Sequence, residues 1–293
     1  MANLAGVTVI EAQTSGEAQT SGEALTAGPV PPRVSIVVPM RDEAEAASWL
    51  IDEIFTTCAA LAPLEVIVVD DGSRDGTVAQ VRALMARHPG LRLLAHAQSA
   101  GQSAAVHSGV LAARAALVCT MDGDGQNPPA DLPRLVAPLL ADAAGRVGLV
   151  AGQRVGRKDT FAKRLASRFA NGLRGWLLKD GTRDTGCGLK AFRRTAYVAL
   201  PYFDHMHRYL PALFNRDGWG VVLVDVGHRE RAAGRSKYTN LQRALVGLHD
   251  LVGVAWLIRR RKKAVAAEWP ALPHAAPVPV PEPAEWRLEQ THG

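Results

Sequence analysis

The sequence predicts an α/β protein built on a mostly parallel sheet that is covered by helices on both faces. Short β-branched runs, apolar on both faces, recur between residues 34 and 152, and segments of helical spacing separate them. Strands that are apolar throughout are typical of parallel sheets with both faces covered. With 293 residues and 47% hydrophobic content, the chain has enough apolar surface for such a core.

Each expected strand ends at a polar or turn-forming residue. Pro39 ends the first strand, and Asp70 and Asp71 end the second. In chain order, the strands are expected at 34–38, 65–69, 91–95, 116–121 and 147–152. The intervening helices are expected at 46–61, 77–87, 103–113 and 131–140.

Two acidic clusters follow strands of this sheet. Asp70 and Asp71 come after the second strand, and Asp122 and Asp124 come after the fourth. Turn formation explains one such cluster by itself, because Asp, Gly and Ser make good turns. Ligands of open parallel sheets bind outside the carboxyl ends of the strands. Two clusters on the same edge therefore favour a ligand-binding crevice.

Asp122 and Asp124 are separated only by Gly123, and carboxylates this close repel each other unless a positive group lies between them. A calcium loop is excluded because Asn127 stands where that loop needs glycine and Pro133 where it needs glutamate. A phosphoryl-aspartate enzyme is disfavoured because its pair usually follows the first strand. The remaining interpretation is Mg²⁺ or Mn²⁺ that completes its shell with water and phosphate oxygens.

The composition limits the classes of partner that are expected for this chain. A formal net charge of +6 and a pI near 9.5 favour anionic partners, and five consecutive cations occupy 259–263. The absence of aromatic residues interleaved with the basic ones argues against nucleic acid. Cys58, Cys119 and Cys187 match no zinc or disulfide pattern, so a reducing, cytoplasmic setting is expected.

Motifs along the predicted sheet resemble a known family. They are VVPMRDE at 37–43, VIVVDDGSRDGT at 66–77 and MDGDGQNPP at 121–129. In this order they are similar to the nucleotide-sugar core of family 2 inverting glycosyltransferases, which have the Rossmann-like GT-A fold. Three further motifs are AGQR at 151–154, DTGCGLKAFRR at 184–194 and GRSKY at 234–238. Together they resemble the dolichol-phosphate, or polyprenyl-phosphate, mannosyltransferase group over residues 33–260.

On the donor side, the resemblance implies a nucleotide site and a metal site. The nucleotide-binding residues would be Pro39, Glu43, Asp70, Asp71 and Asp122. Asp71 would accept a hydrogen bond from a ring N–H of uracil or guanine. The metal and the sugar diphosphate would be held by Asp122, Asp124 and Gln126. Four residues differ from those usual in the family: Arg41, Asp42, Ser99 and Asn127. These differences bear more on which nucleobase is bound than on which reaction is catalysed.

On the acceptor side, a lipid phosphate needs cations and no strong base, because its second pKa near 6 leaves it mostly dianionic. The expected phosphate-binding residues are Arg154, Arg231, Arg235, Ser236 and Lys237. His207 and Arg208 match a recurrent family segment and are expected to line this site. The spacing of His205 and His207 fits no usual zinc pattern, and Cys187 is interpreted as a packed residue rather than a nucleophile.

The segment 241–258 is expected to form a helix that lies in the headgroup layer of a membrane. Full spanning is disfavoured because His249 and Asp250 stand in its middle. Its inward face would carry Leu241, Leu245, Leu248, Val252 and Trp256, with the basic run against anionic lipid. The alternative is a helix packed into the core. The expected location is peripheral, at the cytoplasmic face of the membrane.

These inferences divide the chain into four segments. Residues 1–32, with the duplicated EAQTSG, are expected to be a disordered leader, and residues 264–293 a disordered Pro/Ala-rich tail. Residues 33–233 would form the GT-A catalytic domain. Residues 234–263 would carry the acceptor motif and the interfacial helix.

The predicted activity is transfer of a hexose, such as mannose or glucose, from a GDP- or UDP-linked donor to a polyprenyl phosphate, with inversion. The catalytic residues would be Asp122, Asp124, Arg154 and Asp184. One alternative is a family 2 glycosyltransferase that uses a hydroxyl acceptor with Asp184 as the base. A second alternative is a catalytically inert lipid-binding scaffold, which the intact DGD and GRSKY motifs disfavour.

Overall fold

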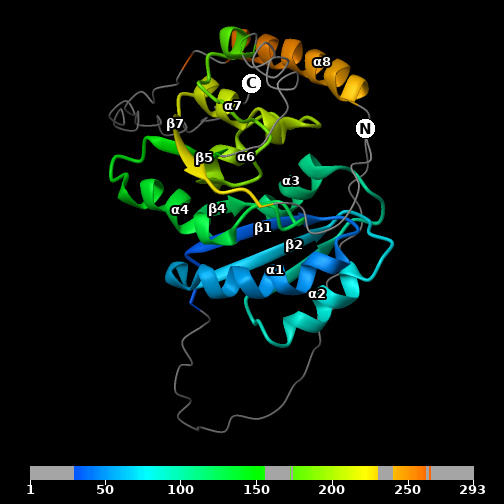
Figure 1. The fold of residues 1–293 in the computed structure, drawn as a ribbon. Helices are drawn as coiled ribbons and strands as arrows, with labels where there is room; N and C mark the ends of the chain where they lie inside the picture. The colour runs from blue at the N-terminus through cyan, green and yellow to red at the C-terminus, as the bar shows by residue number, and fades with distance from the viewer. Residues whose placement is uncertain (1–29, 156–171, 173, 230–239, 262–263, 265–293) are drawn as a thin grey trace, which may run out of the picture.

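The computed structural model describes residues 30–155, 172, 174–229, 240–261 and 264. In these residues a seven-stranded sheet has the order β3-β2-β1-β4-β6-β5-β7 (Figure 1). Its strands are β1 Val34–Met40, β2 Leu64–Asp70, β3 Leu91–Ala95, β4 Leu117–Thr120, β5 Val147–Arg154, β6 Lys190–Arg193 and β7 Gly220–Val226.

All but one of these strands run in the same direction. β1 pairs in parallel with β2 and β4, β2 with β3, and β5 with β7. β6 runs antiparallel to both of its neighbours, β4 and β5. In this register Lys190 is opposite Thr120 on one side and Ala151 on the other. The first residue of β6 therefore lies at the edge of the sheet where β4 ends.

Helices cover both faces of the sheet. They are α1 Ala44–Thr57, α2 Thr77–Met85, α3 Gln102–Ala112, α4 Leu132–Ala141, α6 Arg194–Val198, α7 Leu210–Arg216 and α8 Asn240–Arg259, with 3₁₀ turns η1 Ala59–Leu61, η2 Pro129–Asp131 and η3 Met206–Arg208. Ile36 and Val38 of β1 pack into one buried cluster with α1, α2 and α4. Val37 points to the other face, where the second cluster joins α3, α6, α7 and α8. Figure 1 shows α1 and α2 on one side of the sheet and α8 at the opposite end.

The predicted fold class is confirmed, with two additions. All five expected strands are present, and the four expected helices correspond to α1 to α4. The expected helix 46–61 is divided at Cys58 into α1 and η1. β6 and β7 were not predicted. The GRSKY motif lies outside the described residues, as do the expected leader except residues 30–32 and the expected tail except residue 264.

One face of α8 packs on the domain, as the alternative of a core-packed helix expected, and the placement of its other face in a membrane stays a prediction. Leu251, Val254 and Ala255 are buried in the second cluster, so one face of the helix packs on the domain. Val252 and Trp256 are 62% and 59% exposed. The side chains of Leu241, Leu245 and Leu248 are outside the described set. Among the helices that the structure describes, none has the length and apolar character needed to cross a membrane.

Candidate functional site

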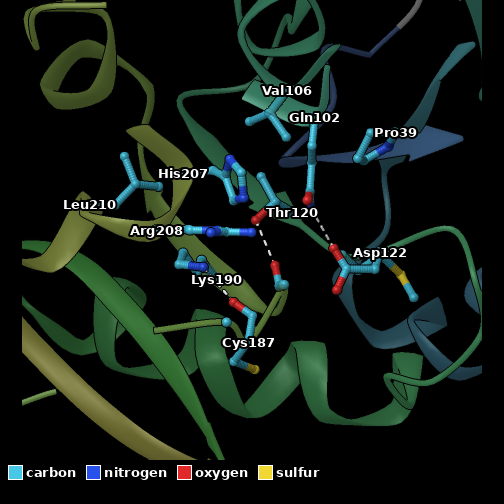
Figure 2. Close-up of a pocket in the computed structure, with 13 residues that line it drawn as sticks. Pro39, Gln102, Val106, Thr120, Asp122, Cys187, Lys190, His207, Arg208 and Leu210 are labelled. Carbon is cyan, nitrogen blue, oxygen red and sulfur yellow. Dashed lines mark hydrogen bonds between the residues drawn. The ribbon is translucent and has the colours of Figure 1, made fainter. Parts of the chain in front are cut away.

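A cavity of about 100 Å³ opens at the sheet edge where β1 and β4 end (Figure 2). Pro39 comes from the end of β1, and Thr120 and Asp122 come from the end of β4. The opposite wall comes from α3 and from the η3–α7 segment. The further lining residues are Gln102, Val106, Met121, Gly186, Cys187, Gly188, Lys190, His207, Arg208 and Leu210. The cavity thus lies at the sheet edge where the sequence predicts a ligand-binding crevice.

Asp122 is the acidic group of this cavity. Its Oδ1 accepts a hydrogen bond from Gln102 Nε2 at 2.6 Å, and its Oδ2 accepts one from Asn127 Nδ2 at 3.0 Å. Burial raises the pKa of Asp122, and the neighbouring Asp124 raises it further. The nearby charge of Lys190 acts in the opposite direction. The carboxylate is therefore held in an environment that disfavours its negative charge.

Glycines let the backbone approach the Asp122 carboxylate closely. A Cβ at Gly188 would lie 2.4 Å from the carboxyl atoms of Asp122. A Cβ at Gly123 would lie 2.7 Å from the carbonyl oxygen of Pro39. Both distances are too short for real contacts. A side chain at Gly188 would displace the Asp122 carboxylate, whereas one at Gly123 would displace the end of β1. Gly188 therefore leaves room for the carboxylate, and Gly123 lets the turn pack against β1.

The donor set around Asp122 fits a hard divalent cation that arrives with a diphosphate. Asp124 is partly buried and accepts a hydrogen bond from the backbone N–H of Gln126 at 3.1 Å, which fixes the turn that carries the pair. Asn127 Oδ1 is buried and has no hydrogen-bond partner. Within the described ranges, no three His, Cys, Asp or Glu side chains form a group that would hold a metal. Mg²⁺ and Mn²⁺ sites commonly use one or two carboxylates and take their other ligands from water and phosphate.

Lys190 is a buried cation of this cavity that the sequence did not single out. Its Nζ donates to the backbone carbonyl of Cys187, and the residue is only 5% exposed. Burial lowers the pKa of Lys190, and this outweighs the opposing charges of Asp122 and Asp184, so the net shift is downward. In Figure 2, Lys190 and Arg208 lie across the cavity from Asp122. One wall of the cavity is therefore acidic and the other is cationic.

His207 lies above this cationic wall. Its Nδ1 is 2.7 Å from Ser103 Oγ, and the backbone N–H of His207 donates to the same hydroxyl at 3.3 Å. Burial lowers the pKa of His207 well below its usual range, and the charges of Lys190 and Arg208 lower it further. The ring is neutral at neutral pH, so it acts as a hydrogen-bonding group rather than a third cation.

Arg154 and Asp184 form a bidentate ion pair. Arg154 Nε and Nη2 donate to the two carboxylate oxygens of Asp184 at 2.6 and 2.9 Å, and both side chains are 13% exposed. Burial lowers the pKa of Arg154, but the hydrogen bond and charge of Asp184 outweigh it and the net shift is upward. Gln153 Oε1 also accepts from the backbone N–H of Arg183 and Asp184. The end of β5 thus holds the segment that leads to Gly186 and Cys187.

Asp71, the predicted nucleobase residue, lies in a cage of donors. Its Oδ1 accepts from the Ala100 N–H and from His96 Nδ1, both at 2.8 Å. Its Oδ2 accepts from Ser99 Oγ at 2.7 Å and from the Gly101 N–H at 2.9 Å. Burial raises the pKa of Asp71, but these hydrogen bonds outweigh it and the net shift is downward. All four acceptor positions of the carboxylate are engaged by the protein.

The other predicted nucleotide residues lie at the ends of β1 and β2. Asp70 Oδ2 accepts from the Ser73 N–H at 3.1 Å, while its Oδ1 is buried and has no hydrogen-bond partner. The Glu43 N–H donates to Thr77 Oγ1 at 2.9 Å. Their roles toward a nucleotide stay predictions. The predicted acceptor residues Arg231, Arg235, Ser236 and Lys237 lie outside the described residues.

Curated relatives of this chain act on polyprenyl phosphates, according to their names. Undecaprenyl-phosphate 4-deoxy-4-formamido-L-arabinose transferase of Edwardsiella ictaluri is 33% identical over 224 residues, which cover 75% of this chain and 66% of the relative. Dodecaprenyl-phosphate galacturonate synthase of Rhizobium johnstonii is 32% identical over 241 residues, which cover 78% and 68%. The chain therefore spans about two thirds of the length of these relatives.

Solved structures of similar fold have been determined with a metal and a nucleotide. Glucosyl-3-phosphoglycerate synthase from Mycobacterium tuberculosis, in complex with Mn²⁺, UDP and glucosyl-3-phosphoglycerate, has a TM-score of 0.60 at 22% identity and covers 78% of this chain and 80% of its own. A mannosyltransferase from Pyrobaculum calidifontis, in complex with GDP-Man and Mn²⁺, has a TM-score of 0.58 at 25% identity and covers 80% and 66%. These likenesses identify the fold as GT-A.

The family itself is identified by sequence. The family model described as glycosyl transferase family 2 matches residues 35–200, which is more than half of the chain and includes the strands that carry both acidic clusters. The chain is a member of glycosyl transferase family 2.

Proposed function

We propose that the protein transfers a sugar from a nucleotide-diphosphate sugar to a polyprenyl phosphate, with inversion at the anomeric carbon. The observation that carries this proposal is the division of one cavity into an acidic wall at Asp122 and a cationic wall at Lys190 and Arg208. Such a division suits a reaction between a metal-bound diphosphate and a second, anionic reactant. The names of the curated relatives support a lipid phosphate as that reactant.

On the donor side, the chain's own residues hold and orient the diphosphate. Asp122 and Asp124 would bind Mg²⁺ or Mn²⁺ with Gln126, and this ion, when bound, stabilises the negative charge of the leaving nucleoside diphosphate. Gln102 Nε2 and Asn127 Nδ2 fix the orientation of the Asp122 carboxylate through the hydrogen bonds described above. Gly188 leaves the space that this carboxylate occupies.

On the acceptor side, cations position the attacking phosphate. Arg208 lines the cavity, and an arginine fork binds two phosphate oxygens at once. Lys190 adds a positive charge within the same wall. A phosphate oxygen that is already ionised needs no general base. It attacks the anomeric carbon from the face opposite the nucleoside diphosphate, whose bond to that carbon breaks as the new C–O bond forms, so the carbon is inverted. Neutral His207 donates or accepts a hydrogen bond at this wall and does not need to move a proton.

Asp184 is assigned a positioning role in this proposal. Both of its carboxylate oxygens accept hydrogen bonds from Arg154, and Oδ1 also accepts from the Gly186 N–H at 3.1 Å. An aspartate engaged in this way orients the turn at 186–188 and is a poor base for a hydroxyl acceptor. Arg154 is likewise a positioning residue through this ion pair, in addition to its expected proximity to phosphate.

The donor sugar and nucleotide are the finer parts of the proposal. A GDP- or UDP-linked hexose, such as mannose or glucose, is proposed from the motif resemblance. The two named relatives transfer 4-deoxy-4-formamido-L-arabinose and galacturonate, so these sugars belong in the same test. We further propose that the enzyme works as a peripheral protein at the cytoplasmic face of the membrane, with the exposed Val252 and Trp256 of α8 toward the lipid.

The test is a donor panel with the full chain. Purified protein is incubated with Mn²⁺ or Mg²⁺, a short polyprenyl phosphate, and UDP- or GDP-linked mannose, glucose, galacturonate or formamido-arabinose. Sugar transfer is expected with at least one donor and is detected by mass spectrometry of the lipid product. NMR of that product is expected to show an inverted anomeric configuration. A matched reaction with the corresponding prenol, which lacks the phosphate, is expected to give no product. Transfer to the prenol but not to the phosphate would overturn the proposal in favour of a hydroxyl acceptor.

A further inference from the structure

A basic groove of about 520 Å³ lies beside the C-terminal part of α8 and shares no lining residue with the catalytic cavity. Its cations are Lys179, Arg216, Arg259 and Arg261, and its apolar edge includes Trp176 and Ile258. None of the described residues that line it is acidic. Arg216 pairs with Asp217, which is outside the groove, at 2.5 Å. The remaining cations leave the groove with an excess of positive charge.

Trp176 is held in an exposed position by a buried anchor. It belongs to a helical segment whose described residues are 172 and 174–178. Arg174 forms a bidentate ion pair with Asp180 at 2.9 and 2.5 Å, with side chains 9% and 0% exposed. The Arg174 guanidinium also lies over the ring of Tyr209, at 5.8 Å. Trp176 is nevertheless 73% exposed. The backbone is therefore held in place on both sides of an indole ring that is mostly exposed to solvent.

The opposite side of the groove is held together in the same way. Arg216 Nε donates to the Leu257 carbonyl at 3.0 Å, and Arg261 Nη1 donates to the Arg216 carbonyl at 3.0 Å. These two hydrogen bonds join the ends of α7 and α8. The cations at 259 and 261 therefore project from a joined framework, close to the anchored tryptophan segment.

We propose that this groove binds the headgroup of an anionic membrane lipid, with Trp176 inserted at the level of the interface. The inference rests on the proposed membrane-surface function and adds a defined site to it. Tryptophan favours the boundary between headgroup and acyl chain, and cations beside it attract an acidic headgroup. A free phosphate ion would use the cations but leave Trp176 and Ile258 unused. Charge and apolar contact together favour the lipid.

The distinctive residues of this proposal are Lys179 and Trp176, which come from a different element than the basic run 259–263. The experiment compares the full chain with Lys179→Gln and Trp176→Ser by co-sedimentation with phosphatidylcholine vesicles, with and without phosphatidylglycerol. Lys179→Gln is expected to weaken binding to the anionic vesicles by about five-fold, which is the contribution of one positive charge near an anionic surface. High salt is expected to remove this difference. Trp176→Ser is expected to weaken binding at both low and high salt.

Matched controls are available at surfaces distant from α8. Arg82→Gln removes one exposed charge from α2, and Leu140→Ser removes one exposed apolar side chain from α4. Both controls are expected to bind vesicles as the parent does. Competition with soluble glycerophosphoglycerol or inorganic phosphate separates a headgroup site from a phosphate site. If inorganic phosphate displaces the protein from vesicles at the same concentration as glycerophosphoglycerol, the groove is a phosphate site and the proposal is wrong.

The outcomes also separate this inference from the proposed reaction. Turnover with a short, water-soluble prenyl phosphate is expected to be the same in Lys179→Gln, Trp176→Ser and the parent. Failure of every donor in the panel would remove the proposed reaction, while altered vesicle binding by these variants would still support the groove. If both variants bind vesicles as the parent does, the proposal that this groove binds lipid is wrong, and any docking depends on other residues.

Discussion

Two aspartates at neighbouring strand ends, Asp71 and Asp122, are held in opposite ways. β2 and β4 both flank β1, so the two carboxylates emerge at the same edge of the sheet. Asp71 accepts four hydrogen bonds from within the fold, and its pKa is lowered. Asp122 accepts two, from the amides of Gln102 and Asn127, and its pKa is raised. The fold satisfies the charge of Asp71, whereas the charge of Asp122 is the one that the proposed function assigns to a cation arriving with the substrate.

The first way to break this comparison is to remove a carboxylate beside Asp122. Asp124→Asn is expected to lower turnover on the order of 100-fold or more, because a bound metal ion stabilises the charge of the transition state by several kcal/mol. The melting temperature of the metal-free protein is expected to stay the same or rise slightly, because a repulsion with Asp122 is removed. Calorimetry and a transfer assay measure the two quantities.

Excess chelator is expected to reproduce the Asp124→Asn loss in the parent protein, and added Mn²⁺ to restore activity in the parent alone. Full activity of the parent in excess chelator would contradict a metal role for the pair.

Asp71→Asn is expected to have its main effect on folding. An asparagine cannot accept all four hydrogen bonds, so two of the donors lose their partner, at a cost of about 2 to 3 kcal/mol in the free energy of unfolding. The hydrogen bonds lower the pKa of Asp71 in the folded state below its ordinary 3.8. Stability from such a group is present above the unfolded pKa and is lost as the pH falls through the folded value.

Denaturant titrations at several pH values test this. The difference between the parent and Asp71→Asn is expected to be constant at neutral pH and to shrink as the pH falls below about 4. A difference that is independent of pH down to the lowest measurable value would mean that charge at Asp71 does not stabilise the fold. Nucleotide titration of the folded variant measures separately whether Asp71 binds a base.

The sequence identified the acidic clusters but not what distinguishes them. Periodicity and turn chemistry are local, so five strands and four helices were predicted with small errors at their ends. The donors around Asp71 follow β3, at 96–101, and their convergence depends on the pairing of β3 with β2. Ser99 was noted only as a departure from the family residue, yet its hydroxyl donates to Asp71 at 2.7 Å.

Arg208 of the cationic wall was expected to line the acceptor site, but Lys190 was missed, for a similar reason. Lys190 is one of 34 lysines and arginines, and nothing nearby in the sequence indicates its burial. Its position follows from β6, a strand of four residues with charges at both ends and antiparallel pairing, which has little periodic signal. The Arg154–Asp184 pair joins residues thirty positions apart, so no local pattern predicted it either.

Lys190→Met tests the contribution of the cationic wall that faces Asp122. Methionine keeps much of the side-chain length without the charge, but the Cys187 carbonyl loses its donor and Asp122 loses a nearby positive charge. The melting temperature is therefore expected to fall, because a buried acceptor and a buried carboxylate lose a partner. Turnover is expected to fall about ten-fold, as happens when a group that orients a site is removed, because Lys190 Nζ no longer donates to the Cys187 carbonyl.

A transfer assay and a thermal melt on the same preparation decide between the two roles of Lys190. Equal turnover with lower stability would make Lys190 a structural residue only. Lys190→Arg, which keeps the charge, is the matched control and is expected to recover part of the activity.

The smallest effect is expected at the thiol that neighbours this lysine. Cys187 is buried, and burial raises the pKa of its thiol although Lys190 acts in the opposite direction, so little thiolate is present at neutral pH. The contact with Lys190 uses the backbone carbonyl of residue 187, which Cys187→Ala preserves. Turnover of Cys187→Ala is expected to stay within about two-fold of the parent, with a loss of about 1 kcal/mol in unfolding free energy for the missing sulfur. Steady-state kinetics, together with the rate of inactivation by a thiol reagent, measures this. A loss of more than ten-fold in turnover, or a burst of covalent labelling at Cys187 that substrate prevents, would give the thiol a chemical role that its burial argues against.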